Sequence, residues 1–353
     1  MRVVATRQVG ETRAAVLDGD RAIELHVERW SERGARAQRK EVYRARVKRI
    51  EPGLNGAFCD LGRGPEGFLP FGKARPEGLH EGGAIGVQVS REAFQEKGPT
   101  LSLFEVEPGP APEIIHAAPP LEERLSMAFD APVRSEKEAG VSLDALFEAA
   151  LSAVAPIPGG GRLIIEPTAA LTAIDVDAAG RKSTSIGAKF ALDLNRSAAK
   201  EAARQIRLRG IGGVVAIDFV ALKKRADQKT LEQTLAAAFA RDPAKVDIAP
   251  ASRFAIVELA RQRVTRSLRE QLLDRSGCMT DETAALQALR RLEAEGRAQG
   301  GAQLILACGA GAASWLEADP IGWRKAMTQR LGARFTLRLD PSLDVHACQV
   351  ETP

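Results

Sequence analysis

The sequence predicts a mixed α/β (α+β) protein with a small β-barrel inserted near its N-terminus. Short strand-like runs separated by Gly or Pro recur between residues 40 and 103, strand-like and helical patterns alternate over 159–275, and a further α/β pattern fills 279–353. Runs of the first kind are typical of small barrels, and the alternation is typical of layered α/β domains. Hydrophobic residues make up 44% and charged residues 27% of the 353 residues, which excludes a disordered or disulfide-stapled chain.

The N-terminal third predicts strands and then a barrel. Residues 1–36 alternate around Gly and Asp-Gly turn signals, which predicts two or three antiparallel strands, too few to fold alone. Within 37–105, the spacing of five short runs predicts a barrel of the OB type, an architecture that binds single-stranded nucleic acids in many proteins. The five runs are VYRARVKRI, GAFCDLG, EGFLPF, AIGVQVS and PTLSL.

The rest of the chain predicts a linker and two α/β units. Five prolines between residues 108 and 120 exclude continuous helix and central strand, so 106–158 is predicted as a linker followed by a helix at 143–154. In 159–275, GRLIIEP and residues 171–176 and 213–219 predict strands, and residues 197–209, 228–240 and 254–273 predict helices. Residues 279–353 predict a small domain with helices near 283–299 and 319–331.

Two predicted strands of the layered domain end in acidic residues. Asp175 and Asp177 close TAIDVD, and Asp218 closes GGVVAID. If these strands are neighbours, Asp175 and Asp218 lie at one strand-end edge, where open α/β sheets bind ligands. A pair of carboxylates there can hold Mg²⁺, which can activate a water for attack on a phosphodiester. The alternative is that strand-end aspartates only cap the loops or helices that follow.

Basic and aromatic residues suggest contacts with an anionic polymer. In the barrel, Tyr43, Phe58 and Phe68 accompany basic residues such as Lys48, a mixture suited to stacking bases and holding phosphates, although aromatic residues also fill barrel cores. Arginines at positions 204, 207 and 209 and at positions 261, 263, 266 and 269 are predicted on helices that flank the acids. They could neutralise phosphates or simply pair with nearby glutamates.

Charge and cysteine usage predict a cytoplasmic protein. The net charge is +4, from 50 Lys and Arg against 46 Asp and Glu, which only weakly favours an anionic partner. Cys59, Cys278, Cys308 and Cys348 form no CxxC pair, and only Cys348 has a histidine close by, His346, so no local metal site is complete. The start lacks the features of a signal peptide, and no run approaches the roughly 18 apolar residues of a membrane span.

Most of the chain resembles the ribonuclease E/G family of bacterial endoribonucleases. The strongest block contains GGRLIIEPTAALTAIDVD, ALDLNRSAAKEAARQIRLRGIGGVVAIDFV and ASRFAIVELARQRVTRSL, and it is similar to the DNase I-like catalytic subdomain of that family. The block VYRARVKRIEPGLNGAFCDLGRGPEGFLPF is similar to the OB-type RNA-binding barrel of the family, inserted after part of a ribonuclease H-like subdomain. The resemblance thus assigns 1–36 to that subdomain, 37–105 to the barrel, 106–158 to a linker with its reduced remainder, 159–275 to the catalytic subdomain and 279–353 to the small C-terminal domain.

The resemblance implies Mg²⁺-dependent hydrolysis of single-stranded RNA, with products that carry a 5′-phosphate and a 3′-hydroxyl. The metal-binding aspartates of the family fall on Asp175 and Asp218, and an asparagine of the family is replaced here by Asp177, which could position a water or a metal. By the same matching, Phe58, Phe68 and Lys97 are the RNA contacts of the barrel. Unstacked bases can lie on such rings, whereas bases inside a duplex cannot.

Two features of the family are missing from the sequence. About fifty residues separate Leu103 from Gly159 without an Arg-Thr-Ala-Gly-like stretch, so the sensor that binds a 5′-monophosphate is expected to be absent. Of the CPxCxGxG zinc link only Cys278 remains, and one thiol from each of two chains cannot complete a four-ligand site. We therefore expect no structural zinc, and any homodimer must form without a zinc link.

The sequence thus predicts a compact endoribonuclease of RNA processing, including ribosomal RNA, or of RNA decay, which cuts independently of the 5′-phosphate. The alternative is a non-catalytic RNA-binding protein that keeps the fold. A small-molecule α/β enzyme is disfavoured because no cofactor fingerprint is present and the basic barrel would have no role.

Overall fold

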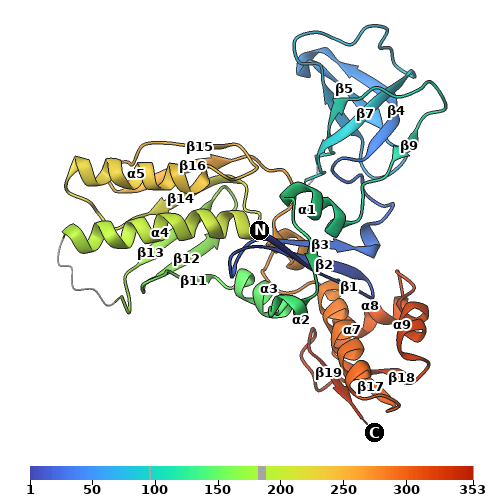
Figure 1. The fold of residues 1–353 in the computed structure, drawn as a ribbon. Coiled ribbons are helices and arrows are strands. Elements are labelled where there is room, and N and C mark those ends of the chain that lie inside the picture. Colours follow the sequence, from blue (N-terminus) through green and yellow to red (C-terminus); the bar gives the residue numbers. More distant parts are fainter. Residues whose placement is uncertain (95–96, 182–187, 353) are drawn as a thin grey trace.

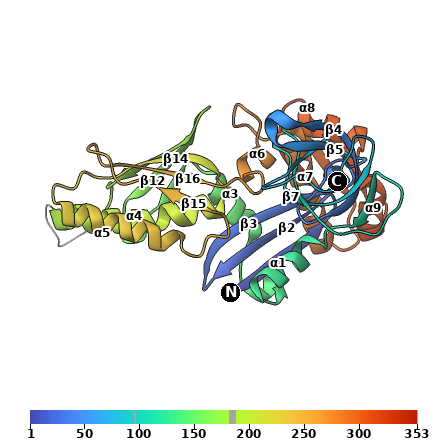
Figure 2. The same cartoon turned by 90° about the horizontal axis from the view of Figure 1, so that it is seen from above.

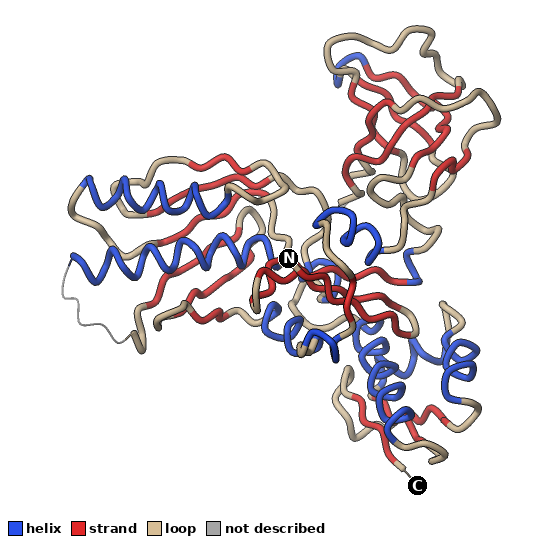
Figure 3. Tube along the Cα trace, viewed as in Figure 1, coloured by secondary structure: helices blue, strands red, loops and turns tan. Residues whose placement is uncertain are grey.

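The computed structural model describes residues 1–94, 97–181 and 188–352. These residues form four β-sheets: an N-terminal sheet, a barrel, a six-stranded sheet and a three-stranded C-terminal sheet. Each sheet contributes to a hydrophobic core. The ribbon shows the barrel and the six-stranded sheet extending from the N-terminal sheet in different directions (Figure 1). Helices and strands alternate along much of the trace, as a mixed α/β fold requires (Figure 3).

The N-terminal sheet has the strand order β10-β1-β2-β3 and is buried on both faces. Its strands are β1 (Arg2–Gln8), β2 (Glu11–Asp18), β3 (Arg21–Arg29) and β10 (Val133–Arg134). The apolar side chains of α1 (Leu121–Phe129) cover one face and those of α3 (Leu143–Leu151) cover the other, while α2 (Glu136–Ala139) lies between them in sequence. This coverage explains why nearly every residue of β2 is buried.

The barrel is closed by five strands, as the sequence predicted. They are β4 (Val42–Glu51), β5 (Gly56–Asp60), β6 (Gly67–Pro70), β7 (Ala84–Arg91) and β8 (Thr100–Leu103), and β4 pairs with both β5 and β7 to close the ring. Short 3₁₀ turns at Trp30–Glu32 and Pro52–Leu54 flank β4. The proline-rich segment is more than the linker predicted, because β9 (Glu113–His116) pairs with the first residues of β4.

The six-stranded sheet has the order β11-β12-β13-β14-β16-β15 and helices on one face only. Its elements are β11 (Val154–Pro156), β12 (Arg162–Pro167), β13 (Thr172–Asp177), α4 (Ala188–Leu208), β14 (Gly213–Asp218), α5 (Arg225–Phe239), β15 (Val246–Ile248) and β16 (Ile256–Arg261). Figure 2 shows α4 and α5 on the same side of this sheet. The opposite face is therefore not covered by these helices.

The helix predicted at 254–273 was wrong. Residues 256–261 form β16, in which Val257, Leu259 and Arg261 are buried in alternation with more exposed residues, the period of a strand. Only α6 (Leu268–Leu272), which starts at a capping box of Ser267 and Glu270, is helical in that segment. The predicted helix was wrong because the sequence ELARQR also fits a helical spacing, and only pairing with β14 and β15 decides for the strand.

The C-terminal domain packs a three-stranded sheet, β18-β17-β19, against helices. Its elements are α7 (Asp281–Ala298), β17 (Leu304–Cys308), α8 (Ala310–Ala318), α9 (Trp323–Leu331), β18 (Phe335–Leu339) and β19 (Cys348–Glu351). Ion pairs of the buried Glu11 with Arg290 and of the buried Arg29 with Glu282 connect α7 to the N-terminal sheet. The helix predicted at 319–331 is α9 alone, since α8 ends at Ala318.

Candidate active site

Asp175 and Asp218 lie side by side on adjacent strands. They are register partners in the parallel pair β13 and β14, flanked in the same row by Ile164 on β12 and Ile256 on β16. Neighbouring strands are about 4.8 Å apart, so the two carboxylates start from backbones separated by that spacing. The prediction that their strands are neighbours is confirmed.

Alternation along the strands places both carboxylates on the face without helices. Ile174 and Val176 of β13, and Val215 and Ile217 of β14, point into the core formed with α4 and α5 and are at most 6% exposed. Asp175 lies between the first two residues, and Asp218 follows the second two. Both aspartates therefore point to the opposite face, and both are exposed. Buried β-branched residues thus fix the direction of the two acids.

Asp177 lies two residues beyond Asp175 and has contacts of its own. Its Oδ2 accepts from Arg162, with 2.7 Å to Nη2 and 2.8 Å to Nε, and its Oδ1 accepts from the backbone N–H of Ala179 at 2.8 Å. These contacts, first the backbone hydrogen bond and then the arginine, hold the pKa of Asp177 below its usual range. The carboxylate of Asp177 is therefore engaged rather than directed at Asp175.

Asn195 of α4 forms hydrogen bonds with the backbone just beyond Asp218. Its amide group is fully buried, donates to the carbonyl of Val220 at 2.7 Å and accepts from the N–H of Val220 at 3.1 Å. The sequence analysis missed this residue. The signal was available, since Asn195 is a polar residue on the apolar face of α4, beside Leu194 and Ala198, and a buried amide needs specific partners.

The pair of aspartates fits a hard divalent cation. Two carboxylates at register-partner positions repel one another unless a cation lies between them. Mg²⁺ takes oxygen ligands and keeps several waters, so two carboxylates are enough protein ligands. No larger cluster of His, Cys, Asp or Glu suited to a metal is found in the part of the chain that the structure describes.

The arginines predicted to flank the acids have other partners. On α4, Arg204 pairs with Glu201 and Arg207 pairs with Glu24, and Arg209, just beyond the end of α4, is buried. Near β16, the remaining partners are Asp242 for Arg261, Glu270 for Arg263 and Glu32 for Arg266. Five of the seven arginines thus form ion pairs within the chain, so the alternative of local pairing describes these five better than phosphate neutralisation.

The barrel carries a half-buried aromatic pair at its surface. Phe58 and Phe68 are register partners on β5 and β6, with ring centroids 5.3 Å apart, and the guanidinium of Arg49 lies 4.6 Å from the centroid of Phe58. A side chain at Gly56 would meet the ring of Phe68 at 2.4 Å, so this glycine makes room for the pair. Lys48 and Lys97 are exposed on the same barrel.

Tyr43 is not a surface residue. Its ring is 0% exposed in the barrel core, and its hydroxyl donates to Glu41. The prediction of Tyr43 as an RNA contact is therefore wrong, because the alternation of β4 directs Tyr43, Ala45 and Val47 inward while Arg46 and Lys48 point outward.

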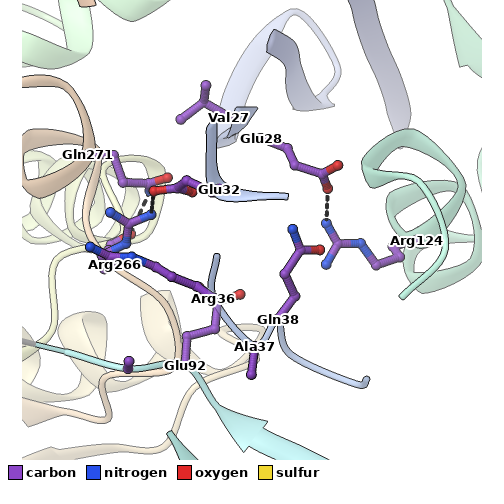
Figure 4. A pocket seen from close by; sticks show the side chains of 11 residues that line it. Val27, Glu28, Glu32, Arg36, Ala37, Gln38, Glu92, Arg124, Arg266 and Gln271 are labelled. Carbon is purple, nitrogen blue, oxygen red and sulfur yellow. Dashed lines mark hydrogen bonds and ion pairs between the residues drawn. The ribbon is translucent and has the colours of Figure 1, made fainter. Parts of the chain in front are cut away.

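A charged pocket lies where the barrel meets the rest of the molecule. Its charged lining residues are three acids and three bases: Glu28, Glu32, Glu92, Arg36, Arg124 and Arg266 (Figure 4). Glu28 pairs with Arg124 at 2.6 Å and Glu32 pairs with Arg266, so acids and bases balance. Burial raises the pKa of Glu92. The paired charges join three parts of the chain and leave the pocket without an excess of either sign.

Two of the four cysteines, Cys308 and Cys348, are register partners on β17 and β19, and the other two lie elsewhere in the chain. Cys278 is exposed in a turn closed by its N–H donating to Asp274, whereas Cys59, Cys308 and Cys348 are buried. Burial raises the pKa of the Cys308 thiol to about 12. Every helix in the described part of the chain is too short or too polar to span a lipid bilayer.

Comparison with known proteins points to one family. Residues 118–264, which contain both aspartates, match the ribonuclease E/G family. Ribonuclease E of Escherichia coli is 24% identical over 84% of this chain and 40% of its own length. Ribonuclease E of Nostoc is 37% identical over 36% of this chain, and a chloroplastic ribonuclease E/G-like protein of Arabidopsis thaliana is 33% identical over 37%. The match to the ribonuclease E/G family covers residues 118–264, and the chain spans less than half the length of the curated relatives that it matches over most of its residues.

Proposed function

We propose that the chain is an endoribonuclease that hydrolyses single-stranded RNA at the edge of the six-stranded sheet. The observation that carries the proposal is the register of Asp175 with Asp218 on the uncovered face, inside the segment that matches the ribonuclease E/G family. The relatives named ribonuclease E support the same class of activity. In this proposal Asp175 and Asp218 hold Mg²⁺.

The chemistry divides between the bound ion and the protein. Mg²⁺ would lower the pKa of a bound water and offset charge on the phosphodiester. Asp175 and Asp218 would hold it on a rigid sheet edge, and Asn195 would fix the backbone that follows Asp218. Asp177 would keep Arg162 in place beside the same edge.

The barrel would supply a separate hold on the RNA. Base stacking on Phe58 and Phe68, with Arg49, Lys48 and Lys97 near the phosphates, is typical of proteins that bind single strands. The barrel and the six-stranded sheet lie in different lobes of the molecule (Figure 1), and α4, which runs along the sheet, is itself about 30 Å long at 1.5 Å per residue. One chain would therefore hold RNA at two places.

We further propose that cutting is independent of the 5′-phosphate. The residues between the barrel and the six-stranded sheet form β9, α1, α2 and α3, which join the barrel edge or pack on the N-terminal sheet. Because this segment packs on the barrel edge and the N-terminal sheet, it supports the proposal that the chain lacks a separate sensor for the 5′-monophosphate. Because the cysteines are free thiols, we also propose a cytoplasmic location and a role in RNA processing or decay.

The test is cleavage of end-labelled single-stranded RNA that carries a 5′-monophosphate or a 5′-hydroxyl, with Mg²⁺ or a chelator. We expect internal cuts that need Mg²⁺, ignore the 5′ end and disappear in Asp175→Asn and Asp218→Asn, which remove charge with little change of shape. Asp247→Asn, which changes an exposed carboxylate on edge strand β15, is the matched control and should cut normally.

Two outcomes would change the proposal. Binding without cleavage under any divalent metal would favour the non-catalytic RNA-binding alternative, for which the engaged Asp177 is the structural argument. A strong preference for the 5′-monophosphate would overturn the independence of the 5′ end.

A further inference from the structure

An exposed aromatic residue stands beside the candidate active site. Phe254, in the turn between β15 and β16, is 67% exposed, the second most exposed of the large hydrophobic residues after Met127 in the part of the chain described. The guanidinium of Arg253 lies 4.7 Å from the centroid of its ring. Single exposed apolar residues are common, so exposure by itself assigns no role.

The turn that carries Phe254 is built to hold one conformation. The hydroxyl oxygen of Ser252 accepts from the N–H of Phe254 at 3.2 Å and from that of Ile256 at 3.3 Å. The N–H of Ser252 donates to the carbonyl of Ile256 at 2.8 Å, and the N–H of Ala255 donates to the carbonyl of Ser252 at 3.0 Å. Ala255 adopts a left-handed φ of 68°, which is unfavourable for a residue with a side chain. Phe254 is thus presented by a fixed backbone.

The same turn contacts the strand that bears Asp218. The N–H of Phe219 donates to the carbonyl of Ala255 at 3.4 Å, and Ile256 is the register partner of Asp218. Phe254 therefore comes from the sheet edge at which Asp175 and Asp218 end, only two residues from that partner. The barrel, in contrast, lies in another lobe (Figure 1). A nucleotide bound at the two aspartates would need a protein contact that lies closer to them than Phe58 and Phe68.

We propose that Phe254 and Arg253 form a nucleotide-binding position of the candidate active site. A base next to the bond that is cut would stack on the ring of Phe254, and Arg253 would lie near a phosphate. Every base has a face that can stack, so this position would hold single-stranded RNA without reading its sequence. The inference rests on the proposed function and adds to it the residues that orient the substrate near Asp175 and Asp218.

The test combines kinetics with a direct probe of stacking. Phe254→Ala should lower kcat/KM for single-stranded RNA about tenfold, the size of one lost base stack, while Phe254→Trp should restore it. Met127→Ala, which removes an equally exposed side chain from α1, is the matched control and should cut like the parent.

The stacking probe is single-stranded RNA with 2-aminopurine placed in turn at each position around the cleavage site, bound to the Asp218→Asn protein. Quenching at one such position should be lost on Phe254→Ala and kept on Met127→Ala. Because this readout needs no cleavage, it separates the two proposals.

A parent that cuts RNA while Phe254→Ala behaves like Met127→Ala in both assays overturns the stacking position alone. A parent that binds RNA without cutting it, with quenching lost in Phe254→Ala, overturns the nuclease and keeps the stacking position. A parent that binds no RNA overturns both.

Discussion

Asn195 and Val220 are joined by two hydrogen bonds that connect the middle of α4 to the chain two residues beyond Asp218. The amide of Asn195 satisfies both the N–H and the carbonyl of Val220, at 3.1 and 2.7 Å, with the asparagine wholly buried. A helix on the covered face of the sheet thus fixes the backbone next to a carboxylate on the uncovered face.

Asn195→Ala should destabilise the chain and weaken Mg²⁺ binding. Leaving two backbone groups of Val220 unpaired costs about 2–6 kcal/mol, at about 1–3 kcal/mol each. If Asn195 positions Asp218, the Mg²⁺ concentration for half-maximal cleavage should also rise, measured below the melting temperature of the variant. Gln228→Ala, which removes a single hydrogen bond to the carbonyl of Leu222, is the control and should not shift that concentration. A destabilised Asn195→Ala protein with an unchanged Mg²⁺ requirement would limit Asn195 to a structural role.

Phe58→Ala and Phe68→Ala should each lower the affinity for single-stranded RNA about tenfold, because each removes one ring of the pair on which a base can stack. Tyr43→Phe should leave the affinity unchanged, since Tyr43 is buried and its hydroxyl contacts only Glu41 among the described residues. Fluorescence anisotropy of labelled RNA at one fixed salt concentration measures both effects. Equal losses in Tyr43→Phe and Phe68→Ala would rule out the surface pair as the binding site.

Asp177→Asn should cut RNA within a few-fold of the parent. The asparagine oxygen can still accept from the N–H of Ala179, and only the ion pair with Arg162 is lost. Because the pKa of Asp177 is lowered, the stability that its ionised carboxylate provides is complete above the ordinary aspartate range. It is lost only as pH falls through the lowered pKa. The ratio of the two activities should therefore be constant from about pH 6 to 9.

A double-mutant cycle of Asp177 and Arg162 measures how far the effect of each substitution depends on the other residue. Arg162→Ala should have the same effect as Asp177→Asn, and the double variant should be no worse than either, since both changes remove one contact. Additive losses would show that Asp177 and Arg162 act independently at the sheet edge.

Glu92→Gln should raise the melting temperature at neutral pH and not at low pH. Burial raises the pKa of Glu92, so the folded state favours its protonated form. The stability that this provides is complete below the unfolded pKa near 4.3 and is lost as pH rises through the folded pKa. Differential scanning calorimetry should give a higher melting temperature for Glu92→Gln at pH 8, by about 2 °C for each kcal/mol. The gain should vanish at about pH 4. Glu77→Gln, on an exposed residue of the same barrel, should show no such dependence.

The sequence by itself determined the order and type of most elements. Alternating apolar residues in VYRARVKRI, TAIDVD and GGVVAID specify strands, since one buried face needs a period of two, and all three form strands. The sequence also placed Asp175 and Asp218 at one strand-end edge on the condition that their strands are neighbours, which the structure shows them to be.

Only the tertiary structure decided which neighbours those residues have. The segment at 254–273 satisfies both helical and strand spacing, and the ladder with β14 and β15 selects β16. Tyr43 and Phe58 are similar in sequence context, and closure of the barrel buries one and leaves the other on the surface. The bond from Asn195 to Val220, and the turn that brings Phe254 to Asp218, join residues distant in sequence. Local patterns report which face of an element is apolar, whereas contacts between elements depend on how those faces pack together.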